Sequence, residues 1–335
     1  MHLNISPKEA LALADPITVE EVLKVISDLP LNKACGTDNL PYEAYRAHAG
    51  VLAPILTELA NEVTNTGRKP ASWGEIIISV LPKVKDSFST HLFRPISLLN
   101  ADYKIIARVW ANRLGPILAN TITHHQRGFI PERDGRENIL IVQILIDTIN
   151  AGTEVDEAQT GGAMVFLDQE KAFDMVAFEA INKTFEWFGW PTRFRNFLKV
   201  IYKEDACVAY IKVNGTVSAD SIPINSGTRQ GCPLSPLIFA VIADLFNQNI
   251  IYHPEFVGHK VGRMTKCISA FADDTGIHIG AFTDIPIYKG MITTYGAATG
   301  GVTNFYKSEA VLLGSWVDNP EVPDLGVRIV EKLDV

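Results

Sequence analysis

Two adjacent aspartates, Asp273 and Asp274, interrupt an apolar stretch of the chain and restrict the folds that this stretch can adopt. The apolar runs on either side, residues 267–272 (CISAFA) and 275–279 (TGIHI), have the length of short β-strands. The pattern predicts a β-hairpin that carries two carboxylates at its tip. Neighbouring carboxylates repel each other in a dry setting, and a divalent cation with oxygen ligands removes that cost. Taken alone, the pair is also typical of a solvated turn, which aspartate favours.

A third carboxylate, Asp168, ends the apolar run 163–167 (AMVFL), as expected of a residue that follows a central strand. On its own, Asp168 is equally consistent with the N-cap of a helix. Carboxylates that hold two Mg²⁺ ions ~3.5–4 Å apart can position the attacking and leaving oxygens of a phosphoryl displacement. The aspartates of the two segments are therefore candidate Mg²⁺ ligands, and the choice between this site and ordinary turns depends on the rest of the chain.

Hydrophobic periodicity and end signals predict helices along much of the chain. A helix over 18–29 starts with Thr18 as its N-cap and has Glu21 three positions later, which is a capping box. The run after Pro233 places apolar residues at helical spacing and predicts an amphipathic helix. Further helices are predicted near 42–66 and over 102–119, 136–150, 177–188 and 192–203.

Other segments predict β-structure. Residues 76–81 (IIISVL) are apolar and rich in β-branched side chains, which predicts a buried strand. Residues 207–213 and 217–224 flank Asn214-Gly215, the strongest local signal for a β-hairpin. Helices dominate the first half of the chain and mix with strands in the second, so we assign the chain to the α+β class.

Composition excludes several classes of protein. Hydrophobic residues make up 47% of the 335 residues and charged residues 20%, which is ordinary for a globular chain and not for a disordered one. The apolar runs are shorter than the ~18 residues of a membrane span, and the N-terminus lacks a signal-peptide pattern. We therefore expect an intracellular protein of the nucleus and cytoplasm, with no membrane partner. The four cysteines stand far apart without a CxxC pair, which indicates reduced structural thiols and argues against a zinc site.

The net charge of −8 is unusual for a protein that binds nucleic acid, because phosphates attract basic surfaces. The charge is uneven, however. Basic residues outnumber acidic ones over 83–136, whereas residues 1–50 are acidic. One basic segment can follow a phosphate backbone while the rest of the chain is acidic, so the overall charge does not decide the question.

A series of segments, in chain order, resembles the reverse transcriptases of non-LTR (LINE-class) retrotransposons. The most specific are RQGCPLSP within 227–239 and the pairing of FLDQEKAFD (166–174) with FADD (271–274). The other matching segments are LPLNKACGTDNLPYEAYR (29–46), LPKVKDSFSTHLFRPISLLNADYKIIARVWANRL (81–114), HHQRGFIPERDGRENIL (124–140) and GGVTNFYKSEAVLLG (300–314). The resemblance covers roughly residues 18–315. The chain departs from the family pattern at Cys35 and Asn39, where Pro and Gly are usual, and this puts the geometry of that loop in question.

The resemblance implies a right-hand polymerase fold with a palm and fingers. It places an N-terminal helical extension at 1–80, the fingers at 81–162, the catalytic palm at 163–315 and the start of a following region, or a truncated tail, at 316–335. The 20 residues after position 315 are too few for the helical thumb of the family. The thumb is therefore expected to be missing or truncated.

The same resemblance assigns roles to the carboxylates and to one lysine. Asp168 and Asp273 are expected to bind two Mg²⁺ ions, with Asp274 as a neighbouring carboxylate of lesser direct role. Lys307 is expected to protonate the leaving pyrophosphate as a general acid. Without the collective match, Lys307 reads as an ordinary surface lysine.

A second group of residues is expected to bind the incoming dNTP. Lys83 and Arg94 grip the triphosphate, and Phe173 stacks under the deoxyribose and excludes a 2′-hydroxyl. Gln230 and Gly231 line the nucleotide pocket, where glycine allows close approach of the backbone. Each has an ordinary alternative: Lys83 at the surface, Phe173 in the core, and Gly231 as the end of a turn before a helix.

The resemblance therefore implies an RNA-directed DNA polymerase that extends a primer 3′-hydroxyl with dNTPs on an RNA template, in retrotransposition. It also implies endonuclease and thumb segments of the same reading frame as further partners. A group-II-intron-type reverse transcriptase or an RNA-dependent RNA polymerase is the enzymatic alternative, which Phe173 and the stretch FRPISLLNADYKIIA disfavour. A catalytically silent RNA-binding remnant is the other alternative. The intact aspartates argue against a remnant, whereas the charge of −8 and the expected lack of a thumb favour it.

Overall fold

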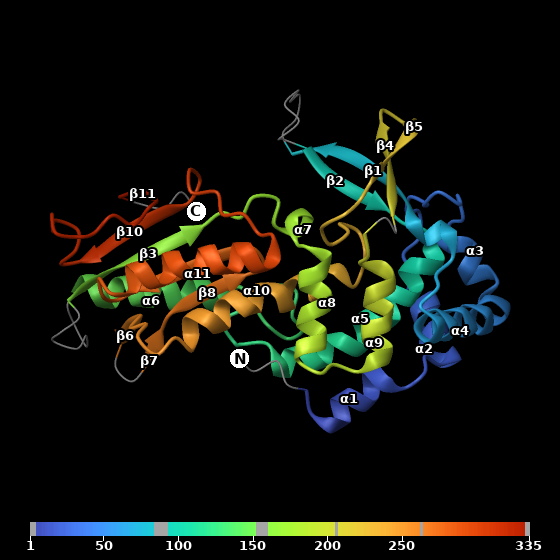
Figure 1. Cartoon of the computed structure of the whole chain (residues 1–335), viewed down its shortest axis with the longest axis horizontal. Coiled ribbons are helices and arrows are strands. Elements are labelled where there is room, and N and C mark those ends of the chain that lie inside the picture. Colours follow the sequence, from blue (N-terminus) through green and yellow to red (C-terminus); the bar gives the residue numbers. More distant parts are fainter. Residues whose placement is uncertain (1–4, 84–92, 152–159, 205–206, 262–263, 332–335) are drawn as a thin grey trace. The chain divides into compact units, whose positions relative to one another are not determined.

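The computed structural model describes residues 5–83, 93–151, 160–204, 207–261 and 264–331. Part of the predicted basic segment, 84–92, lies outside the described residues, as do 1–4 and 332–335 of the predicted end regions. The described chain mixes helices with sheets, which confirms the α+β class (Figure 1).

The chain forms two compact units, and each is built from segments that are separate in the sequence. The N-terminal unit contains Asn4–Ile117 and Val176–Ile238, and the carboxylate unit contains Leu118–Met175 and Phe239–Val335. Compactness does not identify a function. The division at residues 80, 162 and 315 that the sequence suggests therefore stays a prediction.

The N-terminal unit holds a four-stranded sheet with the order β2-β1-β4-β5 (Figure 1). Strand β1 (Glu75–Pro82) pairs antiparallel with β2 (Phe93–Leu98) and parallel with β4 (Val208–Val213). Strand β4 turns at Asn214-Gly215 into β5 (Thr216–Pro223), which confirms the predicted hairpin. Both turn residues have left-handed backbones, with φ of 49° at Asn214 and 86° at Gly215, as a tight hairpin turn requires.

Strand β1 forms where the sequence predicts it, but the prediction that it is buried is wrong. Of its residues, Ile76 alone is buried, and Leu81 is 50% exposed. Isoleucine and valine favour strands because their branched side chains fit a pleated surface, whether or not a second layer covers it. The apolar run therefore predicts that a strand forms but does not predict that the strand is buried.

The helices of the N-terminal unit follow the predicted pattern, with one break. Helix α2 (Val19–Ser27) has the predicted capping box, since Thr18 Oγ1 accepts the Glu21 N–H and Glu21 Oε2 accepts the Thr18 N–H. The single helix predicted near 42–66 is two helices, separated at His48. The helices are α1 (Pro7–Ala14), α2, α3 (Tyr42–Ala47), α4 (Ala49–Thr66), α5 (Ala101–Thr121), α8 (Phe178–Trp187) and α9 (Thr192–Ile201).

Aromatic packing joins α5 to α9, and an ion pair joins α5 to α2. The Trp110 ring on α5 lies 5.3 Å from the ring of Phe194 and 5.7 Å from that of Phe197, both on α9. Arg113 reaches Glu21 on α2 with two hydrogen bonds of 2.6 Å each. The three helices are thus joined by a buried apolar contact and a bidentate guanidinium–carboxylate contact.

The carboxylate unit is built on a five-stranded sheet with the order β11-β10-β3-β9-β8. Strand β3 (Gly161–Leu167) is central and buried along its length, as predicted, apart from a half-buried Phe166. The other strands of this unit are β6 (His259–Val261), β7 (Met264–Lys266), β8 (Ile268–Phe271), β9 (Asp274–Ile279), β10 (Glu309–Gly314) and β11 (Arg328–Ile329). Strand β11 pairs with β10, so part of the predicted tail belongs to this sheet.

Helix α6 (Arg136–Ala151) covers one face of this sheet. Its residue Ile149 packs with Met164 on β3 and Leu313 on β10, and Val142 and Ile146 extend the cluster. On the other side of the pleat, Ala163 and Val165 are fully buried. The unit also contains α7 (Ala172–Met175), α11 (Asp284–Thr299) and most of α10 (Ser235–Ile251).

Helix α10 forms as predicted, but it is buried nearly all round, so the amphipathic assignment is wrong. The Asp244 carboxylate, on the expected solvent face, finds its hydrogen-bond partners inside the protein. Asp244 accepts hydrogen bonds from Gln248 Nε2 at 2.9 Å and from the Thr123 hydroxyl at 2.5 Å. The sequence pattern is the same for a buried carboxylate with such partners and for a carboxylate on the solvent-facing side of a helix.

The four cysteines are free, and Cys207, Cys232 and Cys267 are buried. No helix in the described ranges combines the length and the apolar composition that crossing a membrane requires.

Three histidines of the carboxylate unit are held in their neutral form. Burial lowers the pKa of His259 to about 4, and burial together with the charge of Lys266 lowers that of His125 to about 4. His278 is fully buried, and its pKa is also well below the ordinary value. The folded-state pKa values lie below the ~6.5 of an unfolded chain, so protons bind preferentially to the unfolded protein.

We therefore predict that the contribution of these three histidines to the free energy of unfolding is constant above pH ~6.5 and falls as the pH drops from ~6.5 towards 4. Urea unfolding at a series of pH values measures this slope. The His259→Leu protein should show a shallower slope, because one proton-binding site of the unfolded state is gone. His124→Gln, at an exposed position, is the control and should keep the slope of the unchanged protein. Equal slopes in all three proteins would contradict the assignment.

Candidate active site

The register of the central sheet brings the predicted carboxylates to one edge. Leu167, the last residue of β3, pairs with Thr275 of β9. Asp168 follows the first of these residues and Asp274 precedes the second, so the two backbones meet at the same end of the sheet. The predicted hairpin is confirmed by the pairing of β8 with β9, but only Asp273 lies in its turn, because Asp274 already pairs with Phe271 as the first residue of β9.

Asp273 and Asp274 both have raised proton affinities, to which burial and the neighbouring carboxylates contribute. Burial raises the pKa of the Asp273 carboxyl, its own backbone N–H opposes the rise, and the charge of Asp168 adds to it. Partial loss of solvent raises the pKa of Asp274, and the charges of Asp273 and Asp168 raise it further. These carboxylates therefore lie close enough to repel one another.

No preformed metal cage is present among the residues that the structure describes, since no group of three or more histidine, cysteine or carboxylate side chains is spaced to hold an ion. The chemistry of the donors still fits a hard divalent cation. Mg²⁺ usually takes one or two protein carboxylates and completes its shell with water and substrate phosphates. Mutual repulsion between Asp168, Asp273 and Asp274 is the cost that such a cation would remove.

A groove of about 730 Å³ opens beside the carboxylates. Asp168, Asp274 and Lys307 all line it, so the structure brings three predicted site residues to one cavity. Its apolar walls include Val142 of α6 and the ring of Phe271, which is 45% exposed. With Glu309, which also lines it, the groove thus offers three carboxylates and one ammonium group beside a surface suited to flat apolar groups.

The segment before β10 holds the backbone of Asp168 in place. The carbonyl of Asp168 accepts the Asn304 N–H at 2.8 Å, and the N–H of Asp168 donates to Ser308 Oγ at 3.0 Å. The Ser308 hydroxyl then donates to the Asn304 carbonyl at 2.9 Å, which closes the loop of bonds. Ser308 is fully buried, whereas Lys307 beside it is exposed on the groove. The segment N-x-x-K-S therefore supplies two hydrogen bonds to the backbone of Asp168, from Asn304 and Ser308, and one cation, Lys307.

A buried amide holds the turn that carries Asp273. Gln126 Oε1 accepts the N–H of Ala272 at 2.8 Å and that of Gly128 at 2.9 Å, and Gln126 Nε2 donates to the Ala272 carbonyl at 3.1 Å. Gln126 is fully buried. Ala272 has a left-handed backbone with φ of 58°, a conformation that costs an L-residue roughly 1–2 kcal/mol. The Gln126 amide therefore fixes the turn by binding both the N–H and the carbonyl of Ala272.

Close packing completes this brace. A Cβ atom at Gly128 would lie 2.2 Å from the backbone nitrogen of Ala272, so no other residue fits there without moving the turn. Asn138 Nδ2 donates to the carbonyl of Ala270 at 2.9 Å, and the Arg127 N–H donates to the same carbonyl at 2.9 Å. We refer to Gln126, Gly128 and Asn138 as the hairpin brace.

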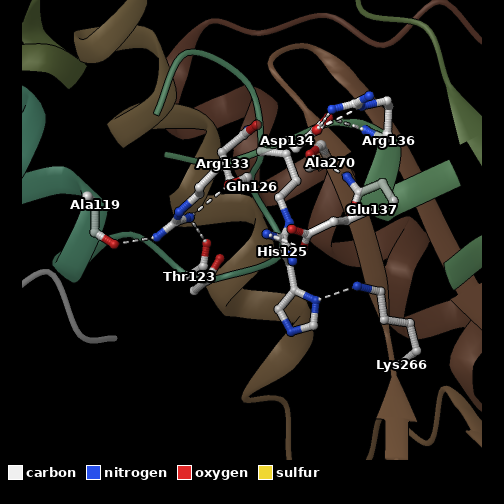
Figure 2. A network of polar contacts seen from close by, with 12 residues as sticks. Ala119, Thr123, His125, Gln126, Arg133, Asp134, Arg136, Glu137, Lys266 and Ala270 are labelled. Atoms are coloured by element: carbon white, nitrogen blue, oxygen red, sulfur yellow. Dashed lines mark hydrogen bonds and ion pairs between the residues drawn. The ribbon is translucent and has the colours of Figure 1, made fainter. Parts of the chain in front are cut away.

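A guanidinium group orders the loop that presents the brace. Figure 2 shows Arg133 reaching back to the end of α5, where it donates to the carbonyls of Ala119 at 2.8 Å and Thr123 at 2.5 Å. It also donates to the Gln126 carbonyl at 2.7 Å. Arg127 forms an ion pair of 2.7 Å with Glu137. Arg133 thus satisfies carbonyls that the helix end leaves without partners, and it fixes the backbone of Gln126 as well.

Phe173 lies in a small aromatic cluster of the same unit. Its ring is half-buried and stacks on Phe239, with centroids 4.1 Å apart and planes 24° from parallel. The ring of Phe129, which is 47% exposed, meets it edge to face at 5.9 Å. Phe239 therefore packs against one face of the Phe173 ring and restricts its movement.

The remaining predicted residues gather in the N-terminal unit. Arg94 on β2 pairs with Leu81 of β1, and Lys83 follows the end of β1 at an exposed position. The Gln230 carbonyl accepts the Ser97 N–H of β2 at 2.7 Å. A Cβ at Gly231, where φ is 119°, would lie 2.5 Å from the Ser97 carbonyl oxygen, so the close approach that the sequence predicts for this glycine is a contact with β2.

The loop at Cys35 and Asn39 shows how the chain tolerates its departures from the family pattern. Asn39 adopts a left-handed backbone with φ of 55°, which asparagine tolerates better than most residues other than glycine. The loop is anchored to Asn100, whose Oδ1 accepts the Thr37 hydroxyl at 3.2 Å and the Asp38 N–H at 3.4 Å. The glycine-like conformation at position 39 is thus kept without glycine.

Gln126, Asn304 and Ser308 were not predicted as site residues, although each lies inside a segment that the family resemblance covers. Their signal was present as polar side chains at fixed distances from a candidate residue: Ser308 follows Lys307, and Gln126 precedes the GF pair of its segment. Their partners lie more than a hundred residues away, so pattern alone does not identify them.

Comparison with known proteins gives one family. The sequence profile of "Reverse transcriptase (RNA-dependent DNA polymerase)" matches residues 81–329. Over 313 residues the chain is 29% identical to "Transposon TX1 uncharacterized 149 kDa protein" of Xenopus laevis, which covers 93% of this chain and 23% of that protein. Over 267 residues it is 30% identical to "Probable RNA-directed DNA polymerase from transposon BS" of Drosophila melanogaster, covering 78% and 28%.

A third relative is "Retrovirus-related Pol polyprotein from type-2 retrotransposable element R2DM" of Drosophila melanogaster, 26% identical over 249 residues, covering 74% of this chain and 22% of that protein. The chain thus spans about a quarter of the length of each of these three relatives.

The hairpin brace gives a direct test. Replacing Gln126 with methionine keeps its length but leaves three backbone groups of Ala272 and Gly128 without partners in a buried setting. Each such group costs ~1–3 kcal/mol, so we expect the free energy of unfolding to fall by about 3 kcal/mol or more. Amide hydrogen exchange at Ala272 should accelerate. Gln143→Met, on the exposed side of α6, is the matched control and should change neither quantity. Unchanged exchange at Ala272 would show that the amide does not hold the turn.

Proposed function

The chain belongs to the reverse transcriptase family, and from this premise we propose that it catalyses RNA-directed synthesis of DNA in retrotransposition. The observation that carries the proposal is the meeting of Asp168, Asp274 and Lys307 on one groove, beside the turn that holds Asp273. The family supplies the reaction, and the groove supplies the residue types that phosphoryl transfer needs.

We assign the palm to the five-stranded sheet that bears the carboxylates, and the fingers to the sheet that contains β1 and β2. Support comes from the chemistry each carries: the aspartates stand on the first sheet, and Arg94 and Lys83 stand on the second. The boundaries 81–162 for the fingers and 163–315 for the palm are part of this proposal.

Asp168 and Asp273, with Asp274 beside them, are the residues that would hold two Mg²⁺ ions. When bound, the ions supply activation of the primer 3′-hydroxyl and stabilisation of charge on the leaving oxygen. The protein's own contribution is to fix where the carboxylates stand. Ser308 and Asn304 hold the backbone of Asp168 on one side, while Gln126 holds the turn on the other.

The other predicted residues act on the nucleotide. Arg94 and Lys83 would bind the triphosphate, Arg94 with its planar fork and Lys83 as a point charge. Lys307, exposed on the groove, would donate a proton to the departing pyrophosphate. Gln230 and Gly231 would form the wall of the nucleotide pocket, since their turn is fixed against β2.

The partners that follow from this reaction are an RNA template, a DNA primer and dNTPs. The relatives are about four times as long as the matched region, which supports further segments of the same reading frame, among them an endonuclease and a thumb.

Primer extension separates this proposal from an RNA-dependent RNA polymerase and from a catalytically silent remnant. Poly(rA) with oligo(dT), dTTP and Mg²⁺ should give extension by the polymerase, whereas an RNA-binding remnant should bind the duplex without extending it. An RNA-dependent RNA polymerase should prefer UTP over dTTP on the same template. Binding without any extension, at all Mg²⁺ concentrations, would favour the remnant.

The carboxylates give the first prediction for catalysis. Asp168→Asn and Asp273→Asn should each lower dNTP incorporation roughly 10³-fold or more, because an amide binds Mg²⁺ far more weakly than a carboxylate. The melting temperature should not fall, since each change removes a repelling charge. Asp147→Asn, exposed on α6, is the matched control and should keep full activity. Near-normal extension by either variant would disprove the metal assignment.

Selection between ribose and deoxyribose gives the second prediction for catalysis. A 2′-hydroxyl pressed against Phe173 loses hydrogen bonds to water at a cost of ~1–3 kcal/mol, which corresponds to roughly 5- to 150-fold discrimination. Phe173→Val should therefore raise the ratio of kcat/KM for GTP to that for dGTP by about this factor. Phe185→Leu, in the buried core of the N-terminal unit, serves as the control for lost packing: it should lower the melting temperature and leave the ratio unchanged. A lower melting temperature with no change of ratio in Phe173→Val would assign that ring to the core.

A further inference from the structure

A cavity of about 590 Å³ in the N-terminal unit plays no part in the site described above, apart from sharing one residue with it. It lies between the end of α2, the start of α3, one face of α5 and the turn after Gly231. Gly231 is the shared residue, and its turn is fixed by the bond between Ser97 and Gln230. The cavity is therefore a built feature of one compact unit and not a gap between parts.

The wall from α5 is basic. Lys104, Arg108 and Asn112 stand four residues apart, which places all three side chains on one face of the helix, and all three line the cavity. The ammonium group of Lys104 lies 4.7 Å from the centre of the Tyr42 ring, so the aromatic ring holds the cation at the cavity wall.

The cations of this wall outnumber the acidic residues of the cavity lining. Within the described parts of the chain, neither Lys104 nor Arg108 forms an ion pair with a carboxylate. Asp28 is the single acidic residue of the lining, against two cations. A net positive cavity on a chain of net charge −8 is a local feature that bulk composition does not explain.

The opposite wall is rigid. The turn that contributes Gly231 and Cys232 is held by the contact between Cys232 Sγ and the buried Tyr103 hydroxyl, 3.2 Å apart. A ligand that enters the cavity thus meets two cations and an amide on one side and a fixed backbone on the other. This set suits a phosphate group, because lysine and arginine bind phosphate oxygens and an amide adds a neutral donor.

We propose that this cavity binds a phosphodiester group of the nucleic-acid strand that the protein holds during synthesis. The inference rests on the proposed function for the identity of the strand, since Gly231 belongs to both the predicted nucleotide pocket and this cavity. A phosphate at this wall, one step removed from the nucleotide, would fix the register of the strand without reading its bases.

The test is binding of single-stranded RNA of about 12 nucleotides to the full chain, followed by fluorescence anisotropy between roughly 50 and 300 mM NaCl. The double variant Lys104→Gln/Arg108→Gln should weaken binding about 10-fold. The slope of log K against log [NaCl] should become shallower by about 0.7, the contribution of one phosphate on a single strand. Lys8→Gln/Lys183→Gln removes the same charge from exposed positions on α1 and α8 and should leave both quantities nearly unchanged.

A variant of opposite sign keeps the test independent of folding. Asp28→Asn removes the one acidic group of the lining and should tighten RNA binding several-fold. DNA of the same length and inorganic tripolyphosphate are the further probes. Comparable effects of the double variant on RNA and DNA would assign the site to either strand, and an effect on RNA alone would assign it to the template.

Two results would overturn the proposal. One is equal loss of RNA affinity in the double variant and in the Lys8/Lys183 control, which would reduce the effect to bulk charge. The other is weakened binding of tripolyphosphate or dNTP with unchanged RNA binding, which would make the cavity a triphosphate site. Because these measurements need no catalysis, a protein that binds RNA as expected but fails in primer extension would refute the proposed polymerase activity and leave this inference standing.

Discussion

The pairing of β3 with β9 is the constraint on which the candidate site depends. With Leu167 opposite Thr275, the residue after one strand and the first residue of the other stand at the same edge of the sheet. A slip of one residue would turn the side chain of β9 to the other face and separate the carboxylates. The surrounding contacts act on this edge from two sides: Ser308 fixes Asp168, and Gln126 fixes the neighbouring turn. Repulsion between the carboxylates is thus opposed by backbone hydrogen bonds rather than by side-chain ion pairs.

Sequence alone could place the carboxylates at the ends of strands because the signals of those strands are local. One apolar run ends at Asp168, and two short apolar runs flank Asp273. These runs predict both the strands and the positions at which the strands end. The brace could not be found in this way, because Gln126 is a polar residue in a loop until the hairpin, far along the chain, folds against it. Helix α10 shows the same limit, since Asp244 reads as a solvent-facing residue until Thr123 and Gln248 bind it. A sequence pattern relates residues that are close along the chain, whereas these contacts join residues that are far apart in the sequence.

Charge in this protein is organised at the scale of single cavities. The chain as a whole is acidic, yet Lys104 and Arg108 share one cavity with a single carboxylate, and Lys307 stands among aspartates on the groove. Electrostatic attraction between exposed charges fades over ~8–10 Å at physiological salt, so a phosphate senses the nearest few side chains rather than the total. The acidic balance that argued against nucleic-acid binding is therefore compatible with the basic wall of α5.

The contact between Gly128 and Ala272 also has a genetic side. A first- or second-base change of a glycine codon either adds a side chain or stops translation, and a Cβ at position 128 meets backbone at 2.2 Å. A gene copy that drifts without selection therefore loses the geometry of the carboxylate turn by many different single-base substitutions at this codon, while the core that surrounds it is untouched. Codon 128 is thus a place where decay of a gene copy becomes visible in its sequence before the fold itself is lost.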